Sequence, residues 1–240
     1  MCKPIAHGAN IVVYSTTKYI GGHGLSIGGL IIDGGNFDWE AAGERFPMLN
    51  SPDPSYHGAV WSQAAKPLGP IAYILRARVI LLRDIGSSMS PFNAFTFIQG
   101  LETLPLRMQR HCENAEKVSR FLSKHEKIEK VIYPSLMTGA HKDRADKYLP
   151  SGQGALLGFE LKDGEEAGKK FIDNLKLLYH VANIGDARSL AIHPASTTHS
   201  QLSEDEKAAS GVTPGYVRLS IGIEHIDDIL EDIEQSLQKI

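Results

Sequence analysis

Residues 11–24 combine side chains that could do covalent chemistry. An apolar run from Ile11 to Tyr14 is followed by hydroxyl side chains at positions 15 to 17, by Lys18 and by several glycines. The run has the length and β-branched content of a strand buried on both faces, as in parallel sheets. A lysine amine that is withdrawn from water favours its neutral form, which attacks an aldehyde to form a Schiff base. The stretch therefore predicts a strand that delivers Lys18 into a site.

The groups beside Lys18 could bind an anion. Ser15 and Thr17 lie on one side of an extended segment, so that both hydroxyl groups could donate to a phosphate. The glycines that follow let backbone N–H groups approach the same ligand closely. The other interpretation is an exposed lysine beside an ordinary glycine turn, and the spacing alone leaves both open.

Arg218 lies within the apolar strand pattern Tyr216–Ile221. A buried arginine is costly without an anionic partner, and its planar guanidinium binds a carboxylate through two hydrogen bonds. That carboxylate could belong to a substrate or to a nearby Asp or Glu. His193 and His199 lie six positions apart on a predicted loop, without the further ligands or helical spacing of a zinc pair, so no metal site is predicted.

The lysine stretch resembles the motif of the Cys/Met metabolism family of pyridoxal-phosphate enzymes, which includes the cystathionine synthases and lyases. Within that family the later stretches resemble the O-acetylhomoserine sulfhydrylases, and the likeness runs in order over essentially all 240 residues. The stretches that carry the resemblance are Ser15–Gly24, Ser51–Gly58, Gly185–Leu190, Ile192–Leu202 and Val217–His225.

The resemblance implies an α/β protein with the aspartate-aminotransferase-like (type I) fold of pyridoxal-phosphate-dependent transferases. Residues 1–98 would be the C-terminal part of the large cofactor-binding domain, and residues 99–240 a bridging helix with a smaller α+β C-terminal domain. The family's first half, which supplies partners for the cofactor ring and phosphate, would be absent. We therefore expect the chain alone to hold an incomplete site.

The resemblance also implies an activity, a γ-replacement in which sulfide displaces acetate from O-acetyl-L-homoserine to give L-homocysteine for methionine biosynthesis. Lys18 would be catalytic and would bind pyridoxal 5'-phosphate together with Ser15 and Thr17. Arg218 and Ser189 would bind the substrate carboxylate, although Ser189 could equally be a turn hydroxyl. The alternatives are a cystathionine γ-synthase or γ-lyase type of enzyme and a non-catalytic fragment or partner subunit of the same fold.

Composition narrows the partners and the location. The chain is 42% hydrophobic, which suffices for an ordinary core, and its formal net charge of −3 with mixed signs does not favour nucleic acid. The two cysteines fit a reducing compartment, and no segment has the length of a membrane span or the core of a signal peptide. We expect a cytoplasmic protein. The resemblance adds a homo-oligomer, a tetramer, or a complementing N-terminal half as its partner.

Apolar spacing predicts the elements that must position these residues. Residues 26–33 should form a second buried strand, residues 34–70 a long excursion with short helical fragments, and residues 73–85 an amphipathic helix. A helix should start at Ser90-Pro91, be interrupted near Gly100 and Pro105, where it would kink, and resume to about residue 124. Farther on, the pattern predicts strands at 127–133, 155–161, 179–184 and 216–221, a helix at 165–178 and a last helix from about 226 to 237, with a capping box at Ser203 and Glu206.

Overall fold

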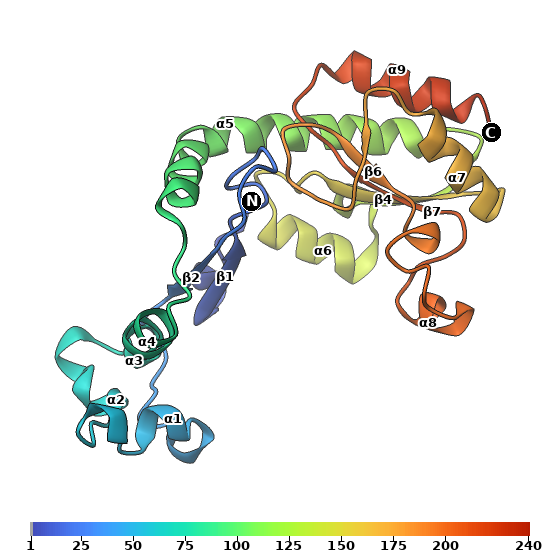
Figure 1. Cartoon of the computed structure of the whole chain (residues 1–240). Coiled ribbons are helices and arrows are strands. Elements are labelled where there is room, and N and C mark those ends of the chain that lie inside the picture. The colour runs from blue at the N-terminus through green and yellow to red at the C-terminus, as the bar shows by residue number, and fades with distance from the viewer. Residues whose placement is uncertain (1) are drawn as a thin grey trace. The chain divides into compact units, whose positions relative to one another are not determined.

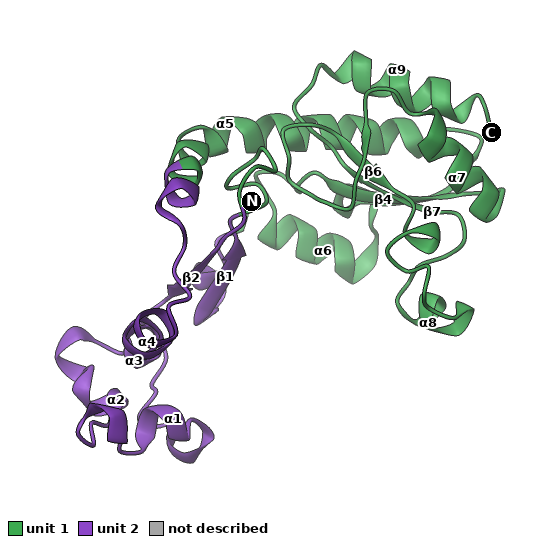
Figure 2. Ribbon diagram, viewed as in Figure 1, with its two compact units in different colours: residues 1–2, 17–26, 96–240 green, residues 3–16, 27–95 purple. Residues whose placement is uncertain are grey.

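The chain folds into two compact units in the computed structural model, which describes residues 2–240 (Figure 1). Residues 3–16 and 27–95 form one unit, and residues 17–26 and 96–240 form the other, together with residue 2 (Figure 2). The predicted boundary at 98/99 falls inside a helix that contributes residues to both units. The division into a large and a small domain stays a prediction.

The first unit contains a two-stranded sheet. Strands β1 (Ile11–Ser15) and β2 (Gly29–Asp33) pair antiparallel, with Ile11 opposite Asp33 and Ser15 opposite Gly29. The prediction of parallel strands buried on both faces is wrong for residues 2–240, because Val13 is 70% exposed and most of β2 is exposed as well. The connection over residues 16–28 contains no helix, so the chain turns back on itself and cannot make the crossover that parallel pairing needs.

Short helices occupy residues 34–70, as the sequence predicts, and the helix predicted at 73–85 is present as three helical segments that follow one another without a break. The α-helices are α1 (Pro47–Asn50), α2 (Trp61–Ala64), α3 (Ala72–Arg76) and α4 (Arg83–Ile85), with a π-helical segment (Ala77–Leu82) between the last two. Short 3₁₀ turns lie at Pro4–His7, Gly43–Arg45, Pro54–Tyr56 and Lys66–Leu68. Their apolar side chains gather around Trp39 and Trp61, so this unit has a core of its own.

The long helix α5 (Pro91–Leu122) starts where the sequence predicts. The Ser90 hydroxyl accepts a hydrogen bond from the backbone N–H of Asn93 at 3.2 Å, as an N-cap does. The predicted interruption is wrong, since the helix continues through Gly100 and Pro105. Pro105 removes one helical hydrogen bond, and Figure 1 shows that the helix bends before its straight C-terminal part.

The second unit is built on a five-stranded sheet in the order β3-β4-β7-β6-β5. The strands are β3 (Ile128–Ile132), β4 (Leu156–Leu161), β5 (Tyr179–His180), β6 (Leu190–Ile192) and β7 (Tyr216–Ser220). All neighbours pair antiparallel except β5 and β6, which are parallel. This mixed sheet agrees with the mixture of helices and strands that the sequence predicts for this region.

Four further helices accompany this sheet, namely α6 (Gly139–Tyr148), α7 (Gly164–Asn174), α8 (Glu204–Ala209) and α9 (Ile226–Leu237). The capping box of Ser203 and Glu206 at the start of α8 is confirmed. The sequence did not predict α6 or β6, and it made the strand from Tyr179 too long, because short segments carry too little periodicity. Side chains of the sheet and of α5, α7 and α9 form one continuous core.

Within residues 2–240, no helix has both the length and the apolar composition that crossing a bilayer requires.

Candidate active site

Lys18 lies in a turn that follows β1 directly. Residues 16–20 form turns, and the backbone N–H of Gly22 donates to the carbonyl of Lys18 at 2.8 Å. Gly22 and Gly24 have φ angles of 73° and 63°, in the left-handed region that glycine adopts without strain. The glycines therefore let the chain reverse direction immediately after the lysine.

Asn183 joins Lys18 to Arg218. The Lys18 Nζ atom donates to the Asn183 side-chain oxygen at 2.5 Å, and the Arg218 Nη2 atom donates to the Asn183 backbone carbonyl at 3.4 Å. The sequence analysis did not single out Asn183. A polar amide at the end of the predicted strand 179–184 was the signal that could have found it.

Arg218 is half-buried in β7, and no Asp or Glu within residues 2–240 lies within 4 Å of its guanidinium. The structural ion pair that the sequence left open is therefore not formed by the part of the chain described. One weak hydrogen bond to a carbonyl leaves most of its five donors for another acceptor. A planar guanidinium in this situation can bind a carboxylate with two hydrogen bonds.

The loop after Asn183 contacts the lysine turn. The backbone N–H of Ala187 donates to the carbonyl of Gly22 at 2.7 Å. Gly185, with a φ angle of 74°, packs so closely on Tyr19 that an added Cβ would lie 2.7 Å from the Tyr19 nitrogen. A side chain at position 185 would therefore separate the loop from the residue next to Lys18.

Ser189 lies in the same loop but is fully buried. Its hydroxyl donates to the Glu224 carboxylate at 2.9 Å and accepts from the backbone N–H of Gly222 at 2.8 Å. Its backbone N–H also donates to Glu224, at 2.6 Å. The hydroxyl thus both donates and accepts a hydrogen bond within the protein, and these bonds fix the loop. Direct binding of a substrate carboxylate by Ser189 stays a prediction.

The predicted phosphate-binding hydroxyls flank a buried threonine. Ser15 is exposed at the end of β1, and Thr17 lines a cavity of about 280 Å³ with His23 and Gly24. Between them, the Thr16 hydroxyl is buried without a hydrogen-bond partner among residues 2–240. Ser15 and Thr17 belong to different compact units, so their shared role in binding a phosphate stays a prediction.

His193 is held by the protein itself. It is buried, and its ring nitrogens lie 2.8 Å from the Ser196 hydroxyl and 2.8 Å from the Pro214 carbonyl. Among residues 2–240 there is no group of three or more His, Cys, Asp and Glu side chains placed to hold a metal ion.

Pyridoxal phosphate fits the groups that this chain provides. Lys18 offers an amine for the aldehyde, and Arg218 offers to a carboxylate a guanidinium that has no acidic partner among residues 2–240. Together with the mixed α/β architecture, these groups fit the class of pyridoxal-phosphate-dependent enzymes with the aspartate-aminotransferase-like fold.

The chain belongs to the Cys/Met metabolism PLP-dependent enzyme family, whose sequence profile matches residues 1–238. It is 56% identical over 246 residues to the O-acetyl-L-homoserine sulfhydrylase of Leptospira meyeri, covering 100% of this chain and 55% of that protein. It is 47% identical over 238 residues to the homocysteine synthase of Schizosaccharomyces pombe, covering 99% of this chain and 55% of that protein.

A solved structure has the same fold. The crystal structure of a "putative O-acetylhomoserine (thiol)-lyase" of Campylobacter jejuni superposes with a TM-score of 0.89 at 40% identity. The match covers 99% of this chain and 56% of that one, and that protein carries a pyridoxyl-lysine phosphate. The present chain thus spans about half the length of the relatives it matches.

Proposed function

We propose that this chain is part of an enzyme that converts O-acetyl-L-homoserine and sulfide into L-homocysteine and acetate. The bond between the γ carbon and the acetate oxygen breaks, and a bond between that carbon and sulfur forms. The observation that carries the proposal is the path from Lys18 through Asn183 to Arg218, which joins an amine and a free guanidinium through one residue. The names of the relatives point to the same reaction.

Each residue has a proposed role that its contacts support. Lys18 would hold the cofactor aldehyde and later move protons between substrate carbons, with Asn183 orienting its amine. Arg218 would bind the substrate α-carboxylate with its planar fork. Ser189 would support that carboxylate site indirectly, because its hydroxyl holds the loop through Glu224 and Gly222.

Ser15 and Thr17 would donate to the cofactor phosphate. When bound, pyridoxal phosphate would supply an electron sink for the negative charge that develops on substrate carbons. The protein's own part would be to hold the lysine amine and the guanidinium near one another, through Asn183.

Borohydride trapping tests the cofactor site. The complete enzyme would be incubated with pyridoxal phosphate, reduced and analysed by peptide mass. We expect the pyridoxyl group on Lys18, and a Lys18→Gln variant that still binds but cannot be trapped. A wild-type protein that stays unmodified would contradict the proposal and favour a non-catalytic protein of the same fold.

A competition assay tests the substrates. The enzyme would be given O-acetylhomoserine with sulfide or with cysteine at equal concentrations. We expect homocysteine as the main product, formed with one equivalent of acetate. Preferential use of cysteine would instead place the chain with the cystathionine γ-synthases.

We further propose a cytoplasmic protein that assembles as a homo-oligomer, a tetramer, or with a complementing N-terminal half. The exposed apolar side chains of β1 and β2 are consistent with surfaces that pack against further protein. Analytical ultracentrifugation of the complete enzyme tests the proposal, since a monomer with full activity would contradict it.

A further inference from the structure

Arg107 in α5 is a buried cation. It is 6% exposed, and no Asp or Glu within residues 2–240 lies within 4 Å of its guanidinium. Its partners are the carbonyls of Tyr19 at 2.8 Å, Ile20 at 3.3 Å and Gly100 at 2.7 Å, with the Thr103 hydroxyl at 3.2 Å. Burial lowers its pKa. Burying a charged guanidinium without an acidic partner costs free energy of folding. The hydrogen bonds that Arg107 makes to these carbonyls therefore suggest a role beyond stability.

Two of these carbonyls belong to the residues that directly follow Lys18. They lie in the turn that the hydrogen bond from Gly22 to Lys18 closes. One guanidinium has five donors in a rigid plane and can hold several carbonyls at once, which a lysine ammonium cannot do with the same geometry. Arg107 therefore fixes the backbone on one side of the catalytic lysine.

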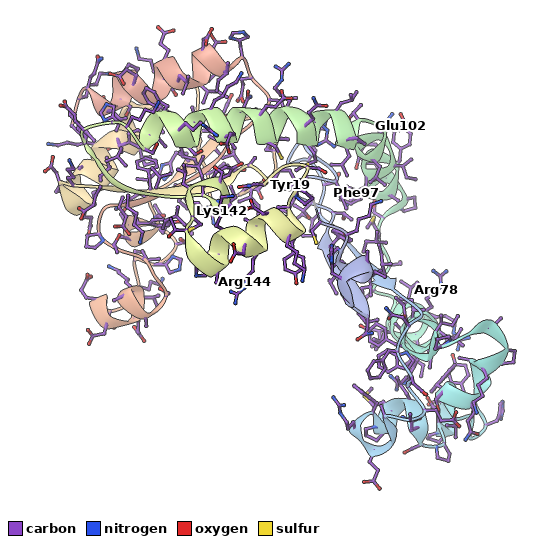
Figure 3. All side chains as sticks on the ribbon, turned by 180° about the vertical axis from the view of Figure 1, so that it is seen from behind. Tyr19, Arg78, Phe97, Glu102, Lys142 and Arg144 are labelled. Atoms are coloured by element: carbon purple, nitrogen blue, oxygen red, sulfur yellow. The ribbon has the colours of Figure 1, made fainter. Side chains whose placement is uncertain are left out.

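Glycines make this close approach possible. An added Cβ at Gly22 would overlap with the Arg107 guanidinium, and an added Cβ at Gly100 would overlap with the Ile20 carbonyl. The lysine turn thus rests directly on α5. Figure 3 shows Tyr19, the residue after Lys18, beside this helix.

The same helix also holds the segment that follows the arginine strand β7. The His111 Nδ1 atom lies 2.6 Å from the Ile221 carbonyl, and the Asn114 amide donates to the carbonyls of Gly222 and Glu224, both at 3.0 Å. Positions 107, 111 and 114 are spaced four and three residues apart, which puts them on one helix face. One rigid element therefore sets the lysine turn and the end of β7 together.

We propose that Arg107 is a positioning residue for Lys18, a role that rests on the proposed function. Its guanidinium holds the carbonyls of Tyr19 and Ile20, so that the Lys18 amine stays at Asn183. Arg107 itself touches neither substrate nor cofactor in this role.

The test separates covalent attachment from simple binding. Arg107→Met and Arg107→Lys would be made in the complete enzyme, with the exposed Arg110→Met on the same helix as a control. Stopped incubations with pyridoxal phosphate, quenched by borohydride, give the rate of attachment to Lys18 by mass. Pyridoxamine phosphate, which has the same phosphate but no aldehyde, gives the non-covalent affinity and counts the competent sites.

We expect attachment per competent site to slow at least about tenfold in both Arg107 variants, because small misplacements of a reacting group have large effects on rate. The affinity for pyridoxamine phosphate should change less than about twofold, and Arg110→Met should match the wild type in both measurements. Attachment at the wild-type rate in either Arg107 variant would overturn the proposal. Loss of pyridoxamine phosphate binding in both would also overturn it, since Arg107 would then act on the fold.

Failure of the proposed function would look different. In that case the wild-type enzyme itself would form no adduct at Lys18, whatever the residue at position 107.

Discussion

At the scale of single residues, the site depends on polar groups whose partners come from distant parts of the chain. The Asn183 side-chain oxygen accepts a hydrogen bond from the Lys18 amine, and its backbone carbonyl accepts one from the Arg218 guanidinium. Glu224 accepts a hydrogen bond from the Ser189 hydroxyl, whereas no Asp or Glu among residues 2–240 lies within 4 Å of the Arg218 guanidinium. Ser189 is thus held by other residues of the chain, whereas Arg218 keeps hydrogen-bond donors for a further acceptor.

Arg218→Lys tests the recognition of a carboxylate. Lysine keeps the charge but loses the two parallel hydrogen bonds, which are worth about 1.5–3 kcal/mol for charged groups. We expect kcat/KM for O-acetylhomoserine to fall by roughly 10- to 150-fold, mainly through KM. Arg144→Lys, on the exposed surface of α6, should change neither constant. An unchanged KM in Arg218→Lys would remove Arg218 from the substrate site.

His111 should make stability depend on pH. Its Nδ1 atom lies 2.6 Å from a carbonyl and must donate, while its buried Nε2 atom has no partner among residues 2–240. Protonating Nε2 would bury an unpaired donor, and burial is the main reason that the pKa of His111 is lowered. Below about pH 6.5 the unfolded chain therefore binds a proton that the folded chain does not, and folding weakens by about 1.4 kcal/mol per pH unit until the lowered pKa is reached.

The measurement is urea unfolding at pH 8 and at pH 5.5. We expect His111→Gln, which can still donate to Ile221, to lose less stability between these pH values than the wild type loses. The exposed His141→Gln should keep the wild-type dependence. An equal loss of unfolding free energy between the two pH values in all three proteins would mean that His111 does not contribute to the pH dependence.

At the scale of elements, α5 is the frame of the site. One face of this helix contacts the lysine turn through Gly100 and Arg107 and the end of β7 through His111 and Asn114. The helix stays continuous across Pro105, so one element carries all of these contacts. The helix can hold both segments because it is long and because Gly100, where it meets the lysine turn, has no side chain.

Gly100→Ala tests this contact. In an open helix the change would stabilise by about 1 kcal/mol, because alanine has the higher helix propensity. Here the new methyl group would overlap with the Ile20 carbonyl, so we expect a loss of about 1–3 kcal/mol and slower trapping of Lys18. Glu102→Ala, exposed on the same helix, should change stability by less than about 0.5 kcal/mol. A stabilised Gly100→Ala protein would show that the turn does not rest on the helix.

At the scale of the whole molecule, the chain has two cores, one in each compact unit. Both tryptophans, Trp39 and Trp61, lie in the core of the unit formed by residues 3–16 and 27–95. Tryptophan fluorescence therefore reports unfolding of that unit, whereas far-UV circular dichroism reports both.

We expect Phe171→Ala and Leu49→Ala to act on different transitions. Each removes a buried side chain, at a cost of about 2–5 kcal/mol. Phe171→Ala should lower the midpoint seen by circular dichroism and leave the fluorescence midpoint unchanged, and Leu49→Ala should lower the fluorescence midpoint. Coincident transitions in both variants would show that the two units unfold as one cooperative system.

Much of this architecture was predictable, because its signals are local. The Ser90-Pro91 start of α5, the apolar spacing of α9 and the capping box of α8 each involve residues within a few positions of one another. The lysine motif and the family were also evident from contiguous stretches of sequence. Local propensity and short-range spacing suffice for such features.

Tertiary structure alone decided which groups meet. Lys18 and Asn183 lie 165 positions apart, and Arg107 and Tyr19 lie 88 apart, so no periodicity links them. The sequence also did not predict that β1 and β2 pair antiparallel, or that the Ser189 hydroxyl donates to Glu224. The sequence by itself determined the lysine, the arginine and the elements that carry them. Their partners depend on which faces pack together, because a hydrogen bond between distant residues forms only after burial has fixed both backbones.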